Sequence, residues 1–505
     1  MPDYPYLEKI LTARVYDVAI ETPLDPAPML SKRTHNSIFI KREDLQPVFS
    51  FKLRGAHNKL SQLSDSAKAA GVIAASAGNH AQGVALSAQT MNIQSIIVMP
   101  KTTPQIKVSA VKHHGGEVIL HGNTYDEAYL HAKEIAKKKH MTFIHPYDDP
   151  EVIAGQGTVA MEILKQHPNH IDAIFVPVGG GGLLAGVIAY VKKLRPQIKV
   201  IGVEPDDAAC LYAALKANER VVLDSVGIFA DGVAVRQIGK APFQVIKGLV
   251  DDVILATTDE ICAAIKDIFD DTRAISEPAG ALAIAGMKKY IAQHNCTGKT
   301  FVAIDSGANM NFDRLRHVSE RTELGENREA LLAVTIPEEP GSFRKFCHSI
   351  GQHSITEFNY RYADKNNACV FAGIQMRDSQ AEKSKLIERL LKANYEVLDL
   401  SDNDMAKTHI RYMVGGHANG AENEVLYRFI FPERPGALLL FLTRISHRWN
   451  ISLFHYRNHG AAYGRILVGI QVPQEDRDEF KAFLVKLEYP FWEETDNPAY
   501  SLFLR

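Results

Sequence analysis

AIFVPVGGGGLLAG, residues 173–186, passes from a strand pattern through four consecutive glycines into a helix pattern. The same rhythm of a short apolar run and a longer helical stretch recurs up to about Asn311, and it predicts parallel strands with helices on both faces. The runs are apolar almost throughout, so both faces of the sheet are expected to be buried. The fold class is therefore α/β. Other strand patterns include 71–76, 94–100, 199–204 and 300–306, and the helix patterns include 79–90, 124–139 and 259–270.

Length and charge exclude several classes of partner. The chain has 505 residues, which at about 150 residues per domain favours roughly three domains. Its 57 Lys and Arg against 59 Asp and Glu give a net charge of −2, so no global basic field attracts nucleic acid or an anionic membrane. We therefore expect neither nucleic acid nor a membrane as a partner.

The cysteines and the N-terminus point to the cytoplasm. Five cysteines form no C-x-x-C pair, which favours reduced thiols over a disulfide framework or a zinc cluster. Residues 1–17 contain no apolar stretch long enough for a signal peptide. The most apolar window, 174–191, is broken by Pro177 and five glycines, so it is a poor membrane-spanning helix.

An internal repeat occupies the C-terminal part of the chain. Pro337, Pro340 and Gly341 recur as a second Pro-Pro-Gly set at an offset of 95, and the match continues to Gln375 and its counterpart Gln471 at an offset of 96. Each copy shows the order strand, Pro-Gly turn, helix, strand, turn, strand, helix, which is a split βαβ pattern. A charged stretch before it, 314–329, suits a connector. We therefore expect a large domain over 1–320, a connector over 321–329, and two small α+β domains over 330–402 and 425–497.

Lys52 is the first candidate functional residue. It lies in VFSFKLRGA, residues 48–56, after Ser50 and Phe51 and just before a helix pattern. A lysine is usually a solvated surface cation. An apolar, aromatic neighbourhood disfavours the charged form, however, and a neutral amine can form a Schiff base. Taken alone, Lys52 is compatible with both roles.

Two loops that lead from a strand into a helix are candidate anion sites. SAGNHAQG, residues 76–83, offers free N–H groups at a helix N-terminus with Asn79 and His80 as donors, although a tight turn capped by Asn79 is equally expected. The four glycines at 179–182 are entropically costly, which favours a loop whose backbone amides surround a phosphate.

The glycine loop also fits another class of enzyme. Gly180, Gly182 and Ala185 have the spacing of the dinucleotide-binding fingerprint, and Glu204 ends the next strand, where an acid would bind a ribose. The alternative is thus a nicotinamide-dependent amino-acid dehydrogenase. That alternative leaves Lys52 without a role.

Ser306 is the last candidate in the large domain. It follows a strand pattern in IDSGANMNFDR, residues 304–314, where it could cap a helix or present its hydroxyl to a buried ring nitrogen. The histidines show no metal-binding spacing, and no G-x-S-x-G motif of a serine hydrolase occurs.

Four of these motifs together resemble those of the fold type II pyridoxal-phosphate enzymes of the threonine dehydratase family. They are S-F-K-L-R-G-A, S-A-G-N-H-A-Q-G, V-G-G-G-G-L and D-S-G-A-N, and the segments 145–158, 230–235 and 276–281 are also similar to that family. The two repeats resemble the ACT-like, ferredoxin-like regulatory domains of the biosynthetic members. The resemblance implies pyridoxal 5'-phosphate as cofactor and conversion of L-threonine to 2-oxobutanoate and ammonia, the first step of isoleucine biosynthesis.

The resemblance also implies roles for individual residues. Lys52 would hold the coenzyme covalently and later remove the Cα proton of the substrate, with Phe51 packed beside it. Asn79 would hydrogen-bond the ring oxygen of the coenzyme, and Ser306 the pyridine nitrogen. The substrate carboxylate would be held by Ser76, Ala77, Gly78, Asn79 and His80, and the phosphate by Gly179, Gly180, Gly181, Gly182 and Leu183.

The type of residue at 306 bears on the reaction. A neutral serine cannot keep the ring nitrogen protonated as an aspartate would, which favours elimination of the β-hydroxyl over slower side reactions. The coenzyme phosphate would give a proton to the leaving hydroxyl, and Glu277 would face the site as a further acid or base. L-serine is expected to be a poorer substrate, because a pocket gains only about 1 to 3 kcal/mol from one methyl group. A lyase of the same fold that acts mainly on serine remains an alternative.

One position departs from the pattern of metal-binding relatives. Those relatives hold a divalent cation with an acid, a backbone carbonyl and a second acid. Glu204 and Ala208 fit the first two positions, but Cys210 occupies the third. We therefore expect no required divalent metal, and a monovalent ion stays open.

The Pro-Gly turns of the repeats are candidate effector sites. Each starts a helix whose free amides could bind an amino-acid carboxylate, and the resemblance implies isoleucine as inhibitor, valine as antagonist and a homotetramer. For any one of these residues, a role in a packed hydrophobic core is an equally good explanation. A protein that senses amino acids without catalysing a reaction is a further alternative, because it would have the same effector sites. The candidate effector residues are Gly341, Gly436, Leu438, Leu439, Leu453 and Phe454.

Overall fold

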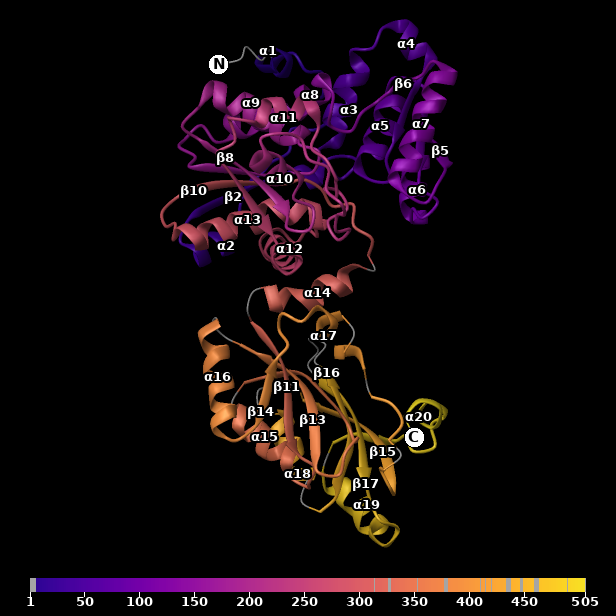
Figure 1. The fold of residues 1–505 in the computed structure, drawn as a ribbon, viewed down its shortest axis with the longest axis vertical. Helices are drawn as coiled ribbons and strands as arrows, with labels where there is room; N and C mark the ends of the chain where they lie inside the picture. The colour runs from indigo at the N-terminus through magenta and orange to yellow at the C-terminus, as the bar shows by residue number, and fades with distance from the viewer. Residues whose placement is uncertain are drawn as a thin grey trace. The chain divides into compact units, whose positions relative to one another are not determined.

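The computed structural model divides the chain into two compact units, Met1–Thr322 and Glu323–Arg505 (Figure 1). The two are described separately below. The structure describes residues 6–312, 314–325, 328–351, 353–376, 380–408, 410–413, 415–418, 420–432, 437–445, 448–457, 463–487 and 489–504.

The first unit contains two sheets. The larger has the strand order β1-β2-β10-β7-β8-β9, and all its neighbouring strands are parallel except β1 and β2. The smaller is wholly parallel, in the order β5-β4-β3-β6. The strands are β1 (Leu24–Pro26), β2 (Ser37–Arg42), β3 (Val72–Ala75), β4 (Ser95–Met99), β5 (Glu117–Leu120), β6 (Thr142–Phe143), β7 (Ala173–Pro177), β8 (Lys199–Pro205), β9 (Asp252–Ala256) and β10 (Thr300–Asp305).

Helices cover both faces of both sheets (Figure 1). The helices of the first unit are α1 (Tyr6–Leu11), α2 (Pro28–Thr34), η1 (Glu43–Leu45), α3 (Lys52–Ser61), α4 (Asp65–Ala70), α5 (Asn79–Thr90), α6 (Gln105–His113), α7 (Tyr125–Lys139), α8 (Pro150–Gln166), α9 (Gly182–Leu194), α10 (Cys210–Ala217), α11 (Lys240–Ile246), α12 (Thr258–Thr272) and α13 (Pro278–His294), and α14 (Arg314–Gly325) begins in the first unit and ends in the second.

The alternation of side chains along β7 shows how the larger sheet is buried. Ile174 and Val176 pack into a core with α8, α9, α10 and α11, whereas Ala173 and Phe175 pack into the opposite core with α2, α12 and α13. Every residue of β7 is buried. The smaller sheet is arranged in the same way, with α3, α5 and α6 on one face and α7 on the other. The expected α/β class with two-sided burial is confirmed.

The predicted elements agree with the structure where the sequence pattern is long. The five strand patterns correspond to β3, β4, β7, β8 and β10, and the pattern over 79–90 is the helix α5. The charged stretch expected to be a connector instead forms α14 over Arg314–Gly325. Val318 is buried against the core of the first unit. Only three of the twelve residues of α14, Leu315, Val318 and Leu324, are apolar, which leaves little periodicity for a sequence analysis to detect.

The second unit is one eight-stranded sheet built from the two repeats. Its order is β14-β11-β13-β12-β16-β17-β15-β18, and the repeats join where β12 pairs with β16 in antiparallel orientation. Each repeat is β-α-β-β-α-β, so a short final strand adds to the expected pattern. The elements are β11 (Glu329–Pro337), α15 (Ser342–Ile350), β12 (Ile355–Arg361), β13 (Asn367–Gln375), α16 (Gln380–Lys392), β14 (Glu396–Asp399), α17 (Asp404–Thr408), η2 (Ile410–Tyr412), β15 (Glu424–Pro432), α18 (Ala437–Ile445), β16 (Asn450–Arg457), β17 (Tyr463–Gln471), η3 (Gln474–Asp476), α19 (Arg477–Lys486), β18 (Phe491–Glu493) and α20 (Pro498–Phe503).

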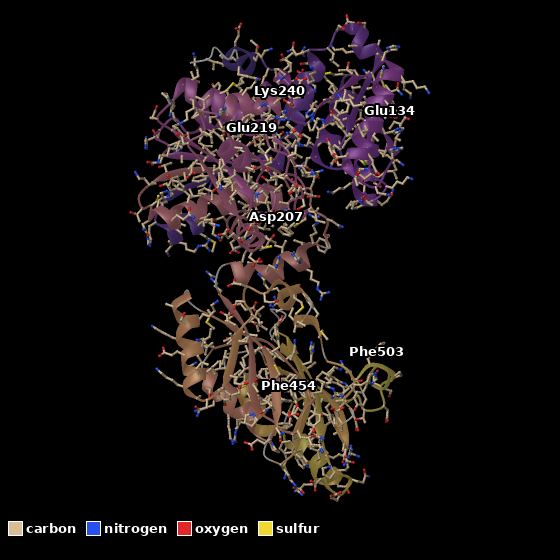
Figure 2. The ribbon with its side chains drawn as sticks, in the orientation of Figure 1. Glu134, Asp207, Glu219, Lys240, Phe454 and Phe503 are labelled. Atoms are coloured by element: carbon tan, nitrogen blue, oxygen red, sulfur yellow. The ribbon has the colours of Figure 1, made fainter. Side chains whose placement is uncertain are left out.

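One core runs through both repeats of the second unit. Phe454 of β16, labelled in Figure 2, is completely buried in it. The Phe454 ring stacks on Phe343 of α15, with 6.3 Å between the ring centroids. The two repeats therefore share a hydrophobic core as well as a sheet.

Two further findings concern the chain as a whole. Among the described residues, no helix has the length and apolar character needed to cross a bilayer. All five cysteines are free thiols.

Candidate active site

Lys52 is the first residue of α3, at a junction between two distant segments. The Phe51 N–H donates to the Ser306 carbonyl at 3.3 Å, and Ser50 forms an isolated antiparallel bridge with Gly307. The Lys52 N–H donates to the Ser50 hydroxyl at 3.3 Å. Two of the sequence motifs thus meet, and they bring Lys52 close to Ser306.

Asn79 connects the second motif to Glu277. Its Nδ2 donates to the Glu277 carboxylate at 2.5 Å, and its Oδ1 accepts from Asn309 at 2.8 Å. Asn79 is the first residue of α5, whereas Glu277 immediately precedes α13. Both side chains are buried, at 9% and 3% exposure. An amide and a carboxyl group from separate motifs therefore form one polar pair.

The His80 ring is engaged by the backbone of the segment after β6. Its Nε2 lies 3.0 Å from the Ile144 carbonyl, which can only accept, so Nε2 carries the proton. Burial lowers the pKa of His80 to about 3, so the ring is neutral and Nδ1 is an acceptor. Within the described part of the chain, Nδ1 has no hydrogen-bond partner. Any donor that His80 offers to a carboxylate is its backbone N–H.

The glycine loop turns between β7 and the N-terminus of α9. Gly181 has a φ of +88°, a conformation that favours glycine, and it directly precedes the first turn of α9. A Cβ at Gly180 would overlap the Tyr147 ring, and a Cβ at Gly179 would lie 2.9 Å from the Val233 Cα. Since four free N–H groups begin a helix, the loop has the donors that a phosphate needs.

Glu277 and Lys52 have perturbed acidities. Burial raises the pKa of Glu277 to about 7, and the Asp231 carboxylate acts in the same direction. Burial lowers the pKa of the Lys52 amine below its usual 10.5, which the Glu277 carboxylate partly opposes. The amine lies 5.6 Å from the centre of the Phe51 ring. Both groups can therefore exchange protons closer to neutral pH than ordinary side chains of their type.

The segment 230–235 joins the glycine loop to the Asn79–Glu277 pair. Val233 contacts Gly179, as above, and a Cβ at Gly232 would lie 3.4 Å from a Glu277 oxygen. The site therefore contains a neutralisable amine, a carboxyl group with a raised pKa and a cluster of backbone donors within one neighbourhood.

Comparison with known proteins identifies the family. Residues 15–307 match the family described as "Pyridoxal-phosphate dependent enzyme", and residues 320–410 and 415–504 both match the "C-terminal regulatory domain of Threonine dehydratase". The "L-threonine dehydratase biosynthetic IlvA" of Burkholderia multivorans (strain ATCC 17616 / 249) is 56% identical over 507 residues, covering 100% of both chains. The Escherichia coli (strain K12) protein of that name is 54% identical over 499 residues, 99% of this chain and 97% of its own.

The chain belongs to the pyridoxal-phosphate-dependent threonine dehydratase family. The processed form of threonine deaminase isoform 2 from Solanum lycopersicum is 51% identical and covers 63% of this chain and 88% of its own, with a TM-score of 0.62. The serine racemase from Dictyostelium discoideum is 32% identical and covers 61% of this chain and 99% of its own, with a TM-score of 0.57. The fold type II catalytic architecture and the cofactor, pyridoxal phosphate, are thereby confirmed.

The residues around Lys52 fit this cofactor of the threonine dehydratase family. The loop 179–182 leaves no room for side chains and ends at a helix N-terminus, as a phosphate site requires. Nothing lies within 4 Å of the position of a Cβ at Gly78, so the backbone before α5 borders open space. The buried Ser306 hydroxyl donates to the Ala279 carbonyl at 3.2 Å, and it could turn to a ring nitrogen instead.

Gly180 offers a direct test of the phosphate loop in this member of the threonine dehydratase family. We expect Gly180→Ala to raise the dissociation constant for pyridoxal phosphate roughly tenfold or more, because the new Cβ forces the loop away from Tyr147. Equilibrium titration of the apoprotein with coenzyme measures this. The matched control is Gly202→Ala in β8, where the nearest atoms to a Cβ are flexible side-chain carbons at 3.3 Å. Equal coenzyme affinity in the two variants would contradict the assignment of the loop.

The contacts of Glu204 exclude the role that a nicotinamide-dependent dehydrogenase would require of it. Both oxygens of this buried carboxylate accept backbone N–H groups at the start of α10, from Leu211 at 2.7 Å and Tyr212 at 2.8 Å. Cys210 Sγ is 3.4 Å from the Gly179 carbonyl. Glu204 therefore holds the start of α10 and, being completely buried, is not accessible to a ribose. Among the described residues, no group of three or more His, Cys, Asp or Glu side chains is arranged to hold a metal ion.

The predicted effector residues lie on two faces of the second unit. Leu438 and Phe454 are in the core shared by the repeats, with Leu439 half-buried against it. Leu453 packs on the opposite face of β16 with Leu426 and Tyr500, because successive strand residues point to opposite faces. Gly341 has a φ of +92° directly before α15. The remaining candidate, Gly436, lies outside the described residues.

Sequence reasoning missed two residues of the site. Tyr147 supports the glycine loop, and Asn309 orients the Asn79 amide by donating to it. Both stand in segments already singled out, 145–158 and 304–314, but a single sequence contains no signal that assigns them to these contacts.

Proposed function

We propose that this chain is a threonine ammonia-lyase, which converts L-threonine to 2-oxobutanoate and ammonia and acts less well on L-serine. The water that is eliminated is regained when the product imine is hydrolysed. The observation that carries this proposal is the meeting of the buried Lys52 amine with the Asn79–Glu277 pair, in a chain that matches biosynthetic threonine dehydratases along its whole length. The product is the carbon skeleton from which isoleucine biosynthesis starts.

The proposed roles follow from the chemistry of the side chains. When bound, the coenzyme supplies an aldehyde that takes up the substrate amine and a ring that withdraws electrons from Cα. Lys52 would bind the aldehyde between turnovers and carry the Cα proton during them, which its lowered pKa supports. Asn79 would turn its Nδ2 to the ring oxygen and Ser306 its hydroxyl to the ring nitrogen. Neither donor brings a formal charge to the ring, which suits β-elimination.

Substrate binding and proton transfer would involve the turn before α5 and Glu277. The segment 76–80 would hold the substrate carboxylate with backbone N–H groups, since the His80 ring is engaged by Ile144. Loop residues 179–182 with Leu183 would bind the phosphate. Glu277, with a pKa of about 7, could hold or release a proton near neutral pH, as a further acid or base in the site requires.

A threonine-dependent oxoacid assay tests this proposal. The purified protein should be yellow, and it should form 2-oxobutanoate from threonine without any nicotinamide cofactor. Serine should be a substrate with a lower kcat/KM. A colourless protein that forms no oxoacid would overturn the proposal, and saturable binding of NADH would favour the dehydrogenase instead.

We also propose feedback control by isoleucine, opposed by valine, through the second unit. The N-terminus of α15 is the best supported effector site in that unit. Gly341 precedes it with a positive φ, and the Ser342 hydroxyl is buried at 2% exposure without a hydrogen-bond partner among the described residues. The equivalent position in the second repeat is Ala437, which has no hydroxyl. A carboxylate at this helix end would satisfy the hydroxyl and the free amides.

Ser342→Ala should weaken inhibition by isoleucine. Loss of one hydrogen bond to a carboxylate should raise the isoleucine concentration for half-inhibition about tenfold, with the rate in its absence unchanged. The assay is 2-oxobutanoate formation over an isoleucine titration. The control, Ser349→Ala, removes a half-buried hydroxyl on the same helix, whose hydrogen bond among the described residues goes to the Lys345 carbonyl. An unchanged isoleucine response in Ser342→Ala would place the effector elsewhere, for example beside Leu439 or Leu453 in the second repeat.

The proposal extends to the setting of the enzyme. We propose a cytoplasmic homotetramer, supported by five free thiols and by the resemblance of the domains to those of the biosynthetic family. The proposed domains are a catalytic domain over 1–320, a connector over 321–329 and regulatory domains over 330–402 and 425–497.

A further inference from the structure

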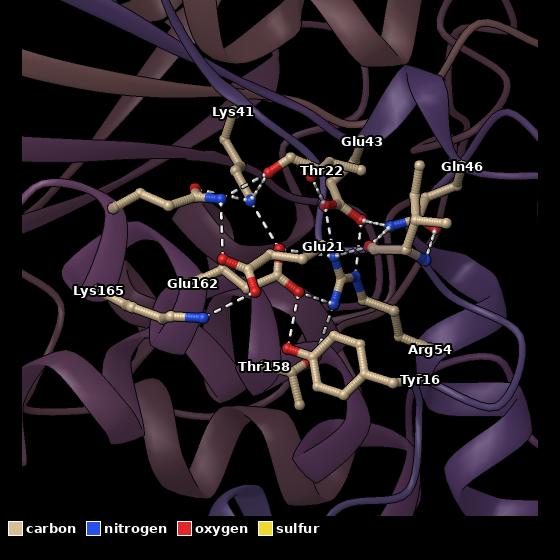
Figure 3. Close-up of polar contacts among 12 residues, drawn as sticks. Tyr16, Glu21, Thr22, Lys41, Glu43, Gln46, Arg54, Thr158, Glu162 and Lys165 are labelled. Carbon is tan, nitrogen blue, oxygen red and sulfur yellow. Dashed lines mark hydrogen bonds and ion pairs between the residues drawn. The ribbon is translucent and has the colours of Figure 1, made fainter.

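Arg54 follows Lys52 by two residues on α3 and is completely buried (Figure 3). Its Nε and Nη2 each donate to Glu43 at 2.8 Å. Its Nη1 and Nη2 donate to Glu162 at 2.5 and 2.9 Å, and Nη1 also donates to the Thr158 hydroxyl at 3.1 Å. Glu43 lies in η1 and Glu162 in α8, so one planar guanidinium joins three elements of the first unit.

The charges of this cluster balance. Lys41 donates to Glu162 at 2.6 Å, so two cations face two carboxylates, and all four side chains are buried. Arg54 and Lys41 lower the pKa of Glu43, which keeps it ionised despite its burial. A buried ionic cluster contributes little net stability compared with well-packed apolar residues of the same size, because desolvation offsets the attraction. Stability alone therefore gives no reason for four buried charges, one of which, Arg54, lies two residues from Lys52.

The first turn of α3 is also fixed by close backbone contacts. A Cβ at Gly83 of α5 would lie 3.0 Å from Leu53 Cα, and a Cβ at Gly155 of α8 would lie 2.6 Å from the Arg54 carbonyl. Phe51, which precedes α3, offers no side-chain cap, and the first N–H of the helix, that of Lys52, donates to the Ser50 hydroxyl. Arg54 supplies a further side-chain interaction, which ties this turn to η1 and α8.

We propose that Arg54 is a positioning residue for Lys52, an inference that rests on the proposed role of Lys52 as the residue that binds the coenzyme. Two bidentate pairs to carboxylates on different elements fix both the place and the rotation of the first turn of α3. The Lys52 amine is carried on that turn. It therefore meets the coenzyme aldehyde, and later Cα, at a set distance, as proton transfer and covalent bonding require.

The test is Arg54→Lys in the full-length protein. Lysine keeps the charge but cannot form two bidentate pairs, so the first turn of α3 loses its fixed orientation. We expect the dissociation constant for pyridoxal phosphate to rise about tenfold, and kcat to fall roughly a hundredfold with KM for threonine changed less than about threefold. Peptide mapping after borohydride treatment should find a smaller share of the fixed coenzyme on Lys52.

The matched control is Asp267→Asn. This change breaks another buried carboxylate of the first unit, which pairs with Arg33 and Lys288 between α2, α12 and α13. It should lower Tm while leaving coenzyme affinity and kcat unchanged. If Arg54→Lys also lowers only Tm, Arg54 has a structural role and the proposal is wrong. If the parent protein itself fixes no coenzyme on Lys52, the proposed function is wrong instead.

A second variant keeps the proposal testable if Arg54→Lys does not fold. Glu43→Gln replaces one of the two bidentate partners of the Arg54 guanidinium with a neutral side chain that has a single acceptor atom, and it leaves the pair with Glu162 intact. We expect the dissociation constant for the coenzyme to rise about tenfold, the effect of losing one hydrogen bond between charged groups. Parent-like affinity and kcat in Glu43→Gln would overturn the proposal.

Discussion

Lys52→Ala is expected to lower the rate of threonine deamination by roughly 10⁴-fold. Alanine removes both the amine that would bind the coenzyme aldehyde and the base that would carry the Cα proton, and loss of a general base alone costs up to about 10⁴-fold. The measurements are 2-oxobutanoate formation and peptide mapping after borohydride treatment. The mapped coenzyme should disappear from the peptide that contains residue 52.

The control for this variant lies on the same helix. Lys59 is also on α3 and pairs with Asp149 at 2.7 Å. Lys59→Ala should keep the parent rate within about twofold, because a partly exposed ion pair contributes little. Deamination by Lys52→Ala at the parent rate would refute the proposed mechanism.

Glu277→Gln is expected to stabilise the apoprotein at pH 8 while lowering activity. Burial raises the pKa of Glu277 from 4.5 to about 7, so between these pH values the unfolded chain loses a proton that the folded chain keeps. The stability of the parent therefore falls as pH rises through this window, and the loss is complete above about pH 7. Glutamine never ionises, so the variant should be more stable by roughly 3 kcal/mol at pH 8 and nearly equal below pH 4.5. Deamination should fall about a hundredfold through loss of an acid or base.

Urea denaturation of the apoprotein at pH 5 and pH 8 measures this effect. Both tryptophans, Trp449 and Trp492, belong to the second unit, so tryptophan fluorescence follows that unit alone. Circular dichroism reports the unfolding of both units. A transition in circular dichroism that has no counterpart in tryptophan fluorescence therefore reports the unfolding of the first unit. A stability difference between variant and parent that is the same at the two pH values would contradict the raised pKa.

The sequence predicted the secondary-structure elements that are long enough to show a clear pattern. The helix over 79–90 was recognisable from its length, and the strand over 173–178 from a continuous apolar run that ends at the glycines. The strands β1 and β6, with 3 and 2 residues, were missed because so few residues show no alternation. The internal repeat predicted two related domains, and only the structure showed that their strands form one sheet.

The individual motifs of the candidate site were predictable from the sequence, but the contacts between them were not. The loop 179–182 stood out because of its four consecutive glycines, and Lys52 because of its apolar, aromatic neighbours, so both were candidates without a structure. The Asn79–Glu277 bond and the position of Tyr147 under Gly180 depend on segments far apart in the chain, which no local pattern encodes. The raised pKa of Glu277 was not predictable from the sequence either, because it is caused by burial, which depends on the whole fold.

The shared sheet of the two repeats ends in its two shortest strands, β14 with 4 residues and β18 with 3. An edge that brief offers few unpaired backbone groups to an incoming strand, which discourages runaway polymerisation through strand addition. Contacts between copies of the enzyme would then have to use side-chain surfaces. Because β12 and β16 belong to one polypeptide, their pairing withstands dilution, and the continuity of the sheet is independent of the enzyme concentration.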